Sequence, residues 1–325
     1  MIVVLLHDDI PPGAPPDQVD VFAQAQAIET ALRQLGHTTA RLAFTGNLPR
    51  DAESLRRLRP DAVFNLVESV GGQGRLVSLA PAWLDGLGVR YTGAGTEAIF
   101  IASSKVLTKR LLAAYGAPTP PWLTTRSDDG VALPLPAKYI IKSAWEEASV
   151  GLEDDCVIEA DSVARLRDEI AQRASRLGGE AFAELYIPGR ELNLSILGGP
   201  DGPQVLPPAE IHFVDYPADR PRLIGYRAKW DPQSFDYHHT PRSFDFAPTD
   251  GPLLAQAREL ARDCWRWLGL RGFARVDLRV DETGQPWVLE VNANPCLVPD
   301  DGFPAAAERA GLSYDQMIAR ILADL

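Results

Sequence analysis

Apolar and polar positions in the N-terminal part of the chain repeat with two different periods. Residues 2–6 are an unbroken apolar run of strand length, and residues 62–67 are apolar except for Asn65, as expected for buried strands. From Asp17 onward, apolar residues recur every three or four positions until Gly36, and a second stripe of this kind ends at Gly88. Such stripes are typical of amphipathic helices that end at a glycine. Strands and helices in alternation predict a small parallel sheet.

The rest of the chain has a mixed pattern. It predicts a helix at 104–115, strands at 139–142, 181–186 and 191–197, a polar and aromatic loop across 215–246, a helix at 253–268, a hairpin and two terminal helices. The expected fold class is therefore α/β, with an α+β C-terminal part. We expect three domains: a βαβ domain at 1–98, a central domain at 99–180 and a C-terminal domain at 181–325.

Residues 275–295 predict a β-hairpin with an unusual charge pattern. Charged or amide residues alternate with apolar ones on both sides of a central segment rich in turn-forming residues. If that turn is tight, Asp277 lies opposite or diagonal to Glu290. Arg275 then lies beside Asn292, on the same face of the hairpin.

Two carboxylates and an amide on one face of a hairpin favour a bound cation. Like charges opposite each other destabilise a strand pair unless a positive charge lies between them. Oxygen ligands without sulfur or imidazole suit Mg²⁺, and Mg²⁺ suits a bound nucleotide. The alternative is an amphipathic surface hairpin with solvated charges, which does not explain the amide beside the second carboxylate.

Composition and charge argue against several classes of function. The chain has 325 residues, 46% of them hydrophobic and 23% charged, as in ordinary soluble proteins. Its net charge of −12 argues against a DNA- or RNA-binding protein. No apolar run has the length of a membrane span, and no basic segment precedes residues 2–6 as in a signal peptide. Cys156, Cys264 and Cys296 are few and widely spaced, which is typical of a reducing compartment, so we expect a cytoplasmic protein.

Two familiar phosphate-binding motifs do not account for a nucleotide in this chain. Residues 93–98 fit the pattern G-x-G-x-x-G/A, but no acidic residue lies between Glu97 and Asp128 to hold a ribose. The P-loop pattern G-x-x-x-x-G-K-[ST] is absent from the sequence. Any nucleotide is therefore held by another arrangement.

Lys142 is the first candidate for such an arrangement. It closes the apolar strand at 139–142, where a lysine is rare without an anionic partner. The loop after it contains the small residues Ala148, Ser149 and Gly151, which would let backbone N–H groups approach phosphate oxygens. A plain connecting loop is the alternative.

Three further segments are ambiguous when each is taken alone. Residues 184–191 fit either a hinge that presents backbone groups and carboxylates to a nucleotide or a solvent-exposed hairpin turn. Lys105 and Lys109, one helical turn apart, are typical of a solvated helix face. Residues 226–230 place cations and aromatic side chains in the long loop at 215–246, which favours a lid over a disordered segment.

In their order along the chain, from about residue 64 to residue 295, these segments resemble the ATP-grasp superfamily, and within it the D-alanine–D-alanine ligases. The resemblance implies a three-subdomain ATP-grasp fold with an N-terminal parallel-sheet domain, a phosphate flap in the central subdomain, and an adenine hinge, lid and magnesium site in the C-terminal one. By position it implies ATP-binding roles for Lys105, Lys142, Ser149, Glu184, Leu185, Ile187, Glu191 and Lys229, magnesium ligation by Asp277, Glu290 and Asn292, and catalytic roles for Arg275 and Lys229.

The resemblance also implies an activity and its cofactors. It implies an ATP-dependent ligase that joins a carboxylate to an amine through an acylphosphate, with ATP and one or two Mg²⁺ ions, for which Mn²⁺ can substitute. The expected partners are small amino-acid or short-peptide substrates, with neither a nucleic acid nor a membrane. Because proteins of this family are often homodimers, a homodimer is possible here.

Several substrate positions depart from the family pattern. Asp17 matches a glutamate near the start of the first helix, although it fits a helix N-cap better. Ala148 and Trp230 stand where the family has a serine and a tyrosine, so the hydrogen-bonded group around the first substrate cannot form with the same donors. Cys296 replaces a glycine, and Asp301 replaces a serine that receives the second substrate's carboxylate. Because like charges repel, Asp301 implies a second substrate with a cationic or polar group there.

These departures lead to three hypotheses about function. The first is a carboxylate–amine ligase with two amino-acid-like substrates that are not strictly both D-alanine. The second is an authentic D-alanine–D-alanine ligase of peptidoglycan synthesis whose substrate site has drifted. The third, from another class, is a catalytically inactive ATP-binding regulatory protein.

Overall fold

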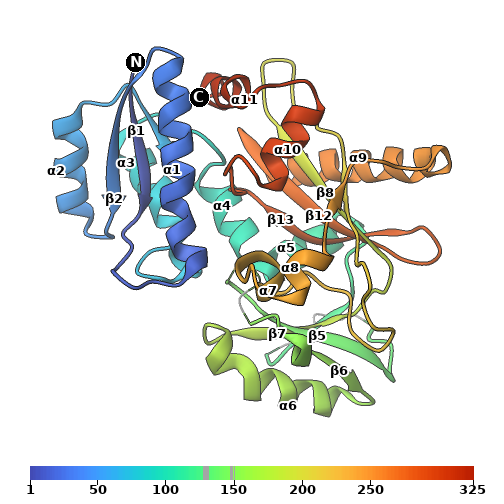
Figure 1. Cartoon of the computed structure of the whole chain (residues 1–325). Coiled ribbons are helices and arrows are strands. Elements are labelled where there is room, and N and C mark those ends of the chain that lie inside the picture. The colour runs from blue at the N-terminus through green and yellow to red at the C-terminus, as the bar shows by residue number, and fades with distance from the viewer. Residues whose placement is uncertain (127–131, 147–148, 150) are drawn as a thin grey trace.

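The N-terminal unit is built on a parallel sheet of order β2-β1-β3 (Figure 1). The computed structural model describes residues 1–126, 132–146, 149 and 151–325. The two predicted apolar runs are β1 (Ile2–Asp8) and β3 (Ala62–Asn65), and the prediction of a parallel sheet is confirmed. β2 (Thr38–Phe44) is absent from the predicted elements because its side chains are mostly half-buried, so its sequence has no unbroken apolar run.

Alternation along β1 divides the helices between the two faces of this sheet. Val3 and Leu5 pack against α1 (Pro16–Gln34), the first predicted helix. Val4 and Leu6, on the other face of β1, pack against α2 (Leu48–Leu58) and α3 (Leu79–Leu87), the second predicted helix. Gly88 ends α3 in the left-handed conformation, with φ of 67°, as the glycine stop signal predicts.

Two further helices lead from the N-terminal unit to the middle of the molecule. α4 (Thr96–Ser103) begins after Gly95, so the glycine pattern at 93–98 is the start of a helix. α5 (Lys105–Ala114) is the helix predicted at 104–115, and the side chain of Ser104 caps it.

The middle unit is an antiparallel sheet of order β4-β7-β5-β6, with one helix packed on it (Figure 1). Its elements are β4 (Trp122–Thr124), β5 (Ala137–Ser143), β6 (Val157–Ala160), α6 (Val163–Arg173) and β7 (Ala181–Leu185). β7 begins directly after the predicted boundary at 180/181, yet it pairs with β4 and β5. Strand pairing therefore carries the middle sheet to Leu185, while the three domain ranges stay a prediction.

The C-terminal unit is an antiparallel sheet with a long helix on one face. The strand order is β11-β10-β8-β12-β13, and β9 pairs with β8. The elements are β8 (Arg190–Leu197), β9 (Gln204–Val205), β10 (Ala209–Ile211), β11 (Arg242–Ser243), α9 (Gly251–Trp267), β12 (Phe273–Val280), β13 (Pro286–Asn292), α10 (Gly302–Arg309) and α11 (Tyr314–Ala323). Short 3₁₀ turns lie at Gly74–Leu76, Asp154–Cys156, Ala174–Leu177 and Pro248–Asp250.

The last helices of the chain join the C-terminal unit to the N-terminal one. Ile318 and Ile321 of α11 belong to the same buried cluster as Val3 of β1 and Ile28 of α1. Figure 1 shows α11 beside the top of α1, with the middle sheet extending away below. The middle sheet and α6, by contrast, form a buried cluster of their own.

The segment predicted as a loop at 215–246 contains regular elements. These are α7 (Tyr226–Trp230), α8 (Phe235–His239) and β11. Ser234 caps α8 through the N–H of Tyr237, and Arg220 forms an ion pair with Asp236 at 2.7 Å. We call residues 215–246 the lid segment. The expectation of an irregular loop is thus wrong, because local caps and ion pairs order it.

Within the described residues, no helix has both the length and the apolar character needed to cross a membrane.

Candidate active site

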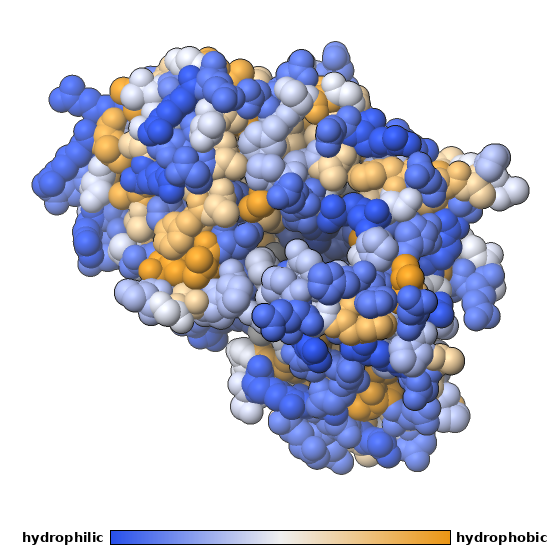
Figure 2. Space-filling model, viewed as in Figure 1, coloured by the Kyte–Doolittle hydropathy of each residue, from blue (hydrophilic) through white to orange (hydrophobic). Residues whose placement is uncertain are grey.

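A large cavity collects the residues that the sequence predicted as functional. It has a volume of about 440 Å³ and lies between the middle sheet, the C-terminal sheet and the lid segment. Figure 2 shows the surface hollowed at the centre of the molecule, among hydrophilic residues. The predicted residues that line it are Asp17, Lys105, Lys142, Ser149, Glu184, Leu185, Ile187, Glu191, Lys229, Trp230, Arg275, Asp277, Glu290, Asn292, Cys296 and Asp301. Ala148 lies outside the described residues. The structure brings this set together, while the role of each residue stays a prediction.

The hairpin formed by β12 and β13 has the predicted register. The N–H of Asp281 donates to the carbonyl of Gln285 at 3.1 Å and closes the turn. The cross-strand pairs are Asp277 with Glu290 and Arg275 with Asn292. A register shift directly after Asp277 marks a β-bulge, an irregularity often found beside functional sites. Two carboxylates and an amide therefore share one face, as the sequence predicts.

Positive charge lies beside both carboxylates of this face. Arg275 donates from Nε and Nη2 to the two oxygens of Asp277, each at 2.8 Å, and Asn193 donates to Oδ1 at 2.8 Å. Lys105 Nζ lies 3.7 Å from Glu290 Oε2. Burial acts to raise the pKa of Glu290, but Lys105 and other cations outweigh it and lower that pKa to about 2. Glu290 is therefore a carboxylate at any physiological pH.

The donor chemistry of this face fits a hard cation. If the amide of Asn292 presents its carbonyl, the side chains on this face offer only oxygen atoms as metal ligands, as Mg²⁺ prefers. These side chains are Asp277, Glu290 and Asn292. No group of three or more His, Cys, Asp or Glu side chains placed to hold a metal occurs among the described residues. With two carboxylates and one amide, an ion at this face would take further oxygens from a ligand, which is typical of Mg²⁺ bound together with phosphate.

A buried ion triplet lies on the middle-sheet side of the cavity. Lys142 Nζ lies 2.5 Å from Glu184 Oε1, and Lys109 Nζ lies 2.7 Å from Glu184 Oε2. Lys109 also donates to Thr119 Oγ1 at 2.7 Å and to the carbonyl of Pro120 at 3.0 Å. Burial would raise the pKa of Glu184, but the two ammonium groups together lower it. The anionic partner expected for Lys142 is confirmed.

Lys109 is not on a solvated face, contrary to the expectation from its spacing with Lys105. Its side chain is 1% exposed, and the same face of α5 buries Leu112. Leu112, an apolar residue one turn after Lys109, is the sequence signal that this face of the helix is buried. Burial lowers the pKa of Lys109 to about 8, although Glu184 acts to raise it.

Residues 184–191 connect two different sheets. β7 pairs in the middle sheet, whereas β8 pairs with β10 and β12 in the C-terminal sheet. The alternative of a simple hairpin turn is therefore wrong. The segment, which we call the hinge, links the two units. Leu185 and Ile187 line the cavity from this hinge. Glu191, at the start of β8, has its Oε2 atom 3.5 Å from Nη2 of Arg279.

The lid segment contacts both the first helix and the loop after Lys142. Tyr226 donates from its hydroxyl to Asp17 Oδ1 at 2.7 Å. Ser149 donates to the carbonyl of Ile224 at 2.9 Å, and the N–H of Tyr226 donates to the carbonyl of Leu152 at 3.2 Å. Lys229 and Trp230 lie in α7, one turn after Tyr226, and line the cavity.

These contacts correct two expectations about the first substrate's side of the site. Asp17 is not the N-cap of α1, because Pro15 occupies that position and no side chain caps the helix. A tyrosine–carboxylate hydrogen bond exists after all, although it comes from Tyr226 and not from position 230. Tyr226 was missed because its partner lies 209 positions away in the sequence.

The expectation of a repulsive Asp301 is also corrected. Asp301 Oδ1 lies 3.3 Å from Nη2 of Arg242, a residue that sequence reasoning overlooked. A paired carboxylate no longer demands a cationic substrate at this place. Nearby, Cys296 Sγ lies 3.3 Å from Asp20 Oδ2, and burial raises the pKa of this thiol well above its usual value, so it stays protonated.

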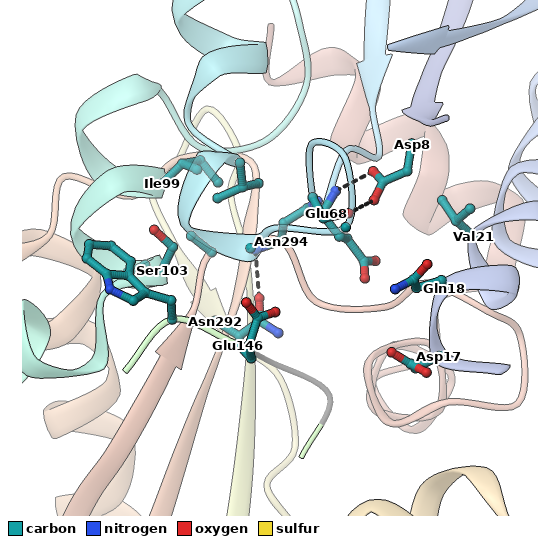
Figure 3. Close-up of a pocket in the computed structure, with 17 residues that line it drawn as sticks. Asp8, Asp17, Gln18, Val21, Glu68, Ile99, Ser103, Glu146, Asn292 and Asn294 are labelled. Atoms are coloured by element: carbon teal, nitrogen blue, oxygen red, sulfur yellow. Dashed lines mark hydrogen bonds between the residues drawn. The ribbon is translucent and has the colours of Figure 1, made fainter. Parts of the chain in front are cut away.

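A smaller cavity of about 80 Å³ opens between α1, α4 and the hairpin (Figure 3). Its lining contains four carboxylates, from Asp8, Asp17, Glu68 and Glu146, and among its described lining residues there is neither Lys nor Arg. Asp8 accepts from the N–H of Glu68 at 2.8 Å and from Ser69 Oγ at 2.6 Å. The smaller cavity shares Asp17, Glu68 and Glu146 with the large one, so the two cavities are adjacent.

Comparisons with known proteins point to one family. The family model described as D-ala D-ala ligase C-terminus matches residues 111–323. A D-alanine–D-alanine ligase of Synechococcus sp. (strain JA-3-3Ab) is 33% identical over 310 residues, which cover 92% of this chain and 87% of that protein. A D-alanine–D-alanine ligase of Gluconobacter oxydans is also 33% identical, over 92% of this chain and 91% of its own length.

A solved structure shares the whole fold. The D-alanine–D-alanine ligase of Bacillus anthracis, crystallised with ATP, matches with a TM-score of 0.73 at 18% identity, over 100% of this chain and 97% of its own. The predicted fold class, with its N-terminal parallel sheet, is confirmed. From the family model and the relatives, the chain belongs to the D-alanine–D-alanine ligase family of the ATP-grasp superfamily and is an ATP-dependent ligase that forms C–N bonds.

Proposed function

We propose that the protein joins the carboxylate of one amino-acid-like substrate to the amine of another, with cleavage of ATP to ADP and phosphate. The observation that carries this proposal is the face of Asp277, Glu290 and Asn292 with Arg275 beside it, set between a cluster of lysines and an acidic cavity. A phosphate donor and a substrate carboxylate can meet only where positive charge gathers, and this is such a place.

ATP occupies the side of the large cavity next to the middle sheet. The hinge residues Leu185 and Ile187, which line this side of the cavity, would contact the adenine, and Glu191 would accept from the ribose hydroxyls. Lys105 and Lys142 bind the phosphates, and Ser149 contributes from the loop above them. Glu184 positions Lys142 through their ion pair and does not itself need to touch the base.

The magnesium ligands are Asp277, Glu290 and Asn292. One or two Mg²⁺ ions bound there, or Mn²⁺ in their place, supply Lewis-acid charge against the phosphate oxygens of ATP. Asp277 is also held by Arg275 and Asn193, which fixes the orientation of its carboxylate.

The reaction has two steps. An oxygen of the substrate carboxylate attacks the γ-phosphorus, and the bond to ADP breaks, which yields an acylphosphate. The amine of the second substrate then attacks the acyl carbon, the amine loses a proton, and phosphate leaves. The developing oxyanion is stabilised by Arg275, while Lys229 from α7 completes the positive charge around the transferred phosphoryl group.

The lid segment excludes water from the acylphosphate. Tyr226 attaches α7 to Asp17 of α1, and Ser149 attaches the loop of the middle unit to the lid segment at Ile224. An acylphosphate exposed to water would hydrolyse, so closure of this kind favours ligation over simple ATP hydrolysis.

The substrates are amino-acid-like and not strictly both D-alanine. The carboxylates of the smaller cavity suit the ammonium group of the first substrate. Trp230, Cys296 and the Arg242–Asp301 pair line the remaining space with groups that differ from the family pattern. Small D-amino acids, other amino acids and short peptides are the candidates.

A second candidate is an authentic D-alanine–D-alanine ligase. The names of the similar proteins favour it, and so does the tyrosine–carboxylate bond that Tyr226 restores. A catalytically inactive ATP-binding protein is the least favoured candidate, because the ion pairs that organise Asp277, Glu290 and Lys142 are intact. A cytoplasmic location and a homodimer stay predictions, and sedimentation of the purified protein would test the dimer.

An isotope experiment tests the proposed chemistry. With the first substrate labelled with ¹⁸O in its carboxylate, one ¹⁸O atom should appear in the released phosphate for each bond formed. Unlabelled phosphate together with a joined product would exclude an acylphosphate. ATP binding without ADP release under any substrate mixture would favour the inactive protein.

A further inference from the structure

One buried arginine of the large cavity has no role in the proposed reaction. Arg279 lies in β12, two positions after Asp277, and lines the cavity. It is 3% exposed, and Glu191 of β8 is its cross-strand partner. A guanidinium buried this deeply is destabilising unless acceptors surround it. The acceptors of Arg279 show which parts of the chain it connects.

These acceptors come from the hinge and from the lid segment. Nη1 of Arg279 donates to the carbonyl of Gly189 in the hinge at 3.1 Å, and Nη2 donates to the carbonyl of Arg222 in the lid segment. Nη2 also lies 3.5 Å from Oε2 of Glu191. The guanidinium carbon lies 5.4 Å from the centre of the Phe213 ring, just before the lid segment. Arg279 therefore connects β12 with the hinge and the lid segment at one point.

Both peptide groups of Arg222 are held by side chains of the cavity. Its N–H donates to the hydroxyl of Tyr186 at 3.0 Å, while its carbonyl accepts from Arg279. Tyr186 belongs to the hinge and lines the cavity. We call Tyr186, Arg279 and the backbone of Arg222 the clasp. Leu223 and Ile224, the next two residues of the lid segment, line the cavity, so the clasp fixes where they begin.

The hinge lies directly against β12 at the clasp. Gly189 has a φ of 133°, and a Cβ atom there would lie 2.0 Å from the carbonyl oxygen of Val280. Only glycine permits this approach, which brings the carbonyl of Gly189 within reach of Arg279. The position of Arg279 relative to the hinge is therefore set by the backbone.

The same guanidinium acts on the carboxylate that is proposed to accept from the ribose. Burial raises the pKa of the Glu191 carboxyl, and Arg279 is the cation that acts most strongly against this rise. A ribose that donates to Glu191 would thus contact a carboxylate that Arg279 helps to keep charged. Arg279 lies between this carboxylate and the lid segment.

We propose that Arg279 is a positioning residue that links the ribose side of the nucleotide site to the lid segment. This inference rests on the proposed function and adds a device to it. Through the carbonyl of Arg222, the guanidinium holds the lid segment against the hinge. A nucleotide with both ribose hydroxyls strengthens this hold through Glu191, whereas a nucleotide without them does not.

Limited digestion with trypsin tests the clasp without any need for turnover. The side chain of Arg222 is exposed, and the carbonyl that Arg279 holds belongs to the bond that trypsin would cut. Cleavage there requires the clasp to open. Initial rates of cleavage between residues 222 and 223, followed by mass spectrometry, should be roughly 10-fold higher in Arg279→Met than in the wild type, as expected when a hydrogen bond to a charged group is lost.

Two milder variants and two nucleotides separate the clasp from a general loss of structure. Arg279→Lys should restore part of the protection, because it keeps one cationic donor. Tyr186→Phe, which removes only the hydroxyl, should raise the rate of cleavage by a smaller factor. ATP with Mg²⁺ should slow cleavage of the wild type several-fold more than 2′,3′-dideoxy-ATP does, and this difference should be lost in Arg279→Met.

Arg320→Met is the matched control. Arg320 of α11 also donates to a backbone carbonyl, that of Gly198 at 2.9 Å, but it is not among the residues that line the cavity. It should leave the rate of cleavage after Arg222 unchanged.

Equal rates for the wild type and a folded Arg279→Met protein would overturn the clasp, and so would an equal increase in Arg320→Met. Equal protection of the wild type by the two nucleotides would overturn the link to the ribose. If the expected rates are found but no substrate pair releases ADP, the role of Arg279 stands and the ligase function fails.

Discussion

At the scale of single residues, the site depends on charges that are held by buried partners. Arg275 orients Asp277, Lys105 lies beside Glu290, and Glu184 forms ion pairs with two lysines. Each of these groups would be costly to bury alone, since an unpaired charge in a protein interior is strongly destabilising. The same pairing that allows burial also fixes the geometry that phosphoryl transfer needs.

Asp277→Asn should abolish ligation while the fold is retained. The amide keeps the size of the side chain and one acceptor, but it removes the negative charge that a metal ligand needs and that Arg275 faces. ADP production should fall by roughly 100-fold or more, as when a key electrostatic group is lost. Normal ADP production by a well-folded Asp277→Asn protein would show that the metal assignment is wrong.

Lys109→Met should destabilise the protein strongly. The substitution removes one of the two lysines that pair with Glu184. The side chains of Lys109 and Glu184 are each only 1% exposed. Removing one partner of a buried pair typically costs about 3–5 kcal/mol. Urea denaturation measures the change, and Lys138→Met is the control, because the pair of Lys138 with Glu159 is exposed and worth about 0–1 kcal/mol. Equal effects of the two substitutions would contradict the structural role of Lys109.

Asp8 should make the stability of the protein depend on pH. Burial raises the pKa of Asp8 from 3.8 to about 6, although the hydrogen bonds from Ser69 and Glu68 act to lower it. The folded protein then binds more protons than the unfolded chain between these two values, so the free energy of unfolding falls as pH rises through this window.

Asp8→Asn removes this titration. Relative to the wild type, the variant should gain on the order of 2–3 kcal/mol of stability between pH 4 and pH 7, as expected for a shift of about two pKa units. Denaturation at several pH values measures the difference. A difference that does not change with pH, or that favours the wild type more at pH 7, would contradict the raised pKa.

At the scale of elements, the lid segment lines one side of the large cavity and contacts two other parts of the molecule. Its contacts reach α1 through Tyr226 and the middle unit through Ser149 and Leu152. Gly225 permits the contact with Leu152, because a Cβ atom at position 225 would lie 2.5 Å from the carbonyl oxygen of Leu152. The lid therefore closes against the middle unit only if position 225 has no side chain.

Gly225→Ala should uncouple ATP cleavage from ligation. The added methyl group pushes the lid away from Leu152, water enters, and the acylphosphate hydrolyses. The ratio of ADP to ligated product should rise several-fold, whereas the melting temperature should change little. Gly251→Ala is the control, because nothing lies within 4 Å of a Cβ atom there. A ratio unchanged from the wild type would mean that this contact does not exclude water.

At the scale of the whole molecule, local patterns predicted much of the fold but fewer of the contacts between units. The hairpin register followed from the turn and the period of two, so Asp277 and Glu290 were placed correctly. The contacts of Tyr226 with Asp17 and of Arg242 with Asp301 join residues 209 and 59 positions apart, where no periodicity operates. Such contacts depend on how the units pack, which a single sequence does not encode in any local signal.

The arrangement of units also explains why the site lies where it does. α11 and α1 share a core that fixes the N-terminal unit against the C-terminal sheet. The middle sheet is attached through the hinge after β7 (Figure 1). The large cavity lies at that junction. The residues predicted to bind the substrates lie on the N-terminal and C-terminal units. They would come together with the nucleotide residues of the middle unit when the hinge closes.

The most direct test of the central claim is ADP release with Mg²⁺ and ATP for pairs from a panel of D- and L-amino acids and short peptides, with mass analysis of the products. We predict that one pair or more releases ADP in proportion to a product whose mass is the sum of both substrates minus water, and that D-alanine is not the best substrate at both positions. A product from D-alanine alone, with no other pair active, would contradict the proposed specificity. ATP binding without ADP release for every pair would contradict the ligase function as a whole.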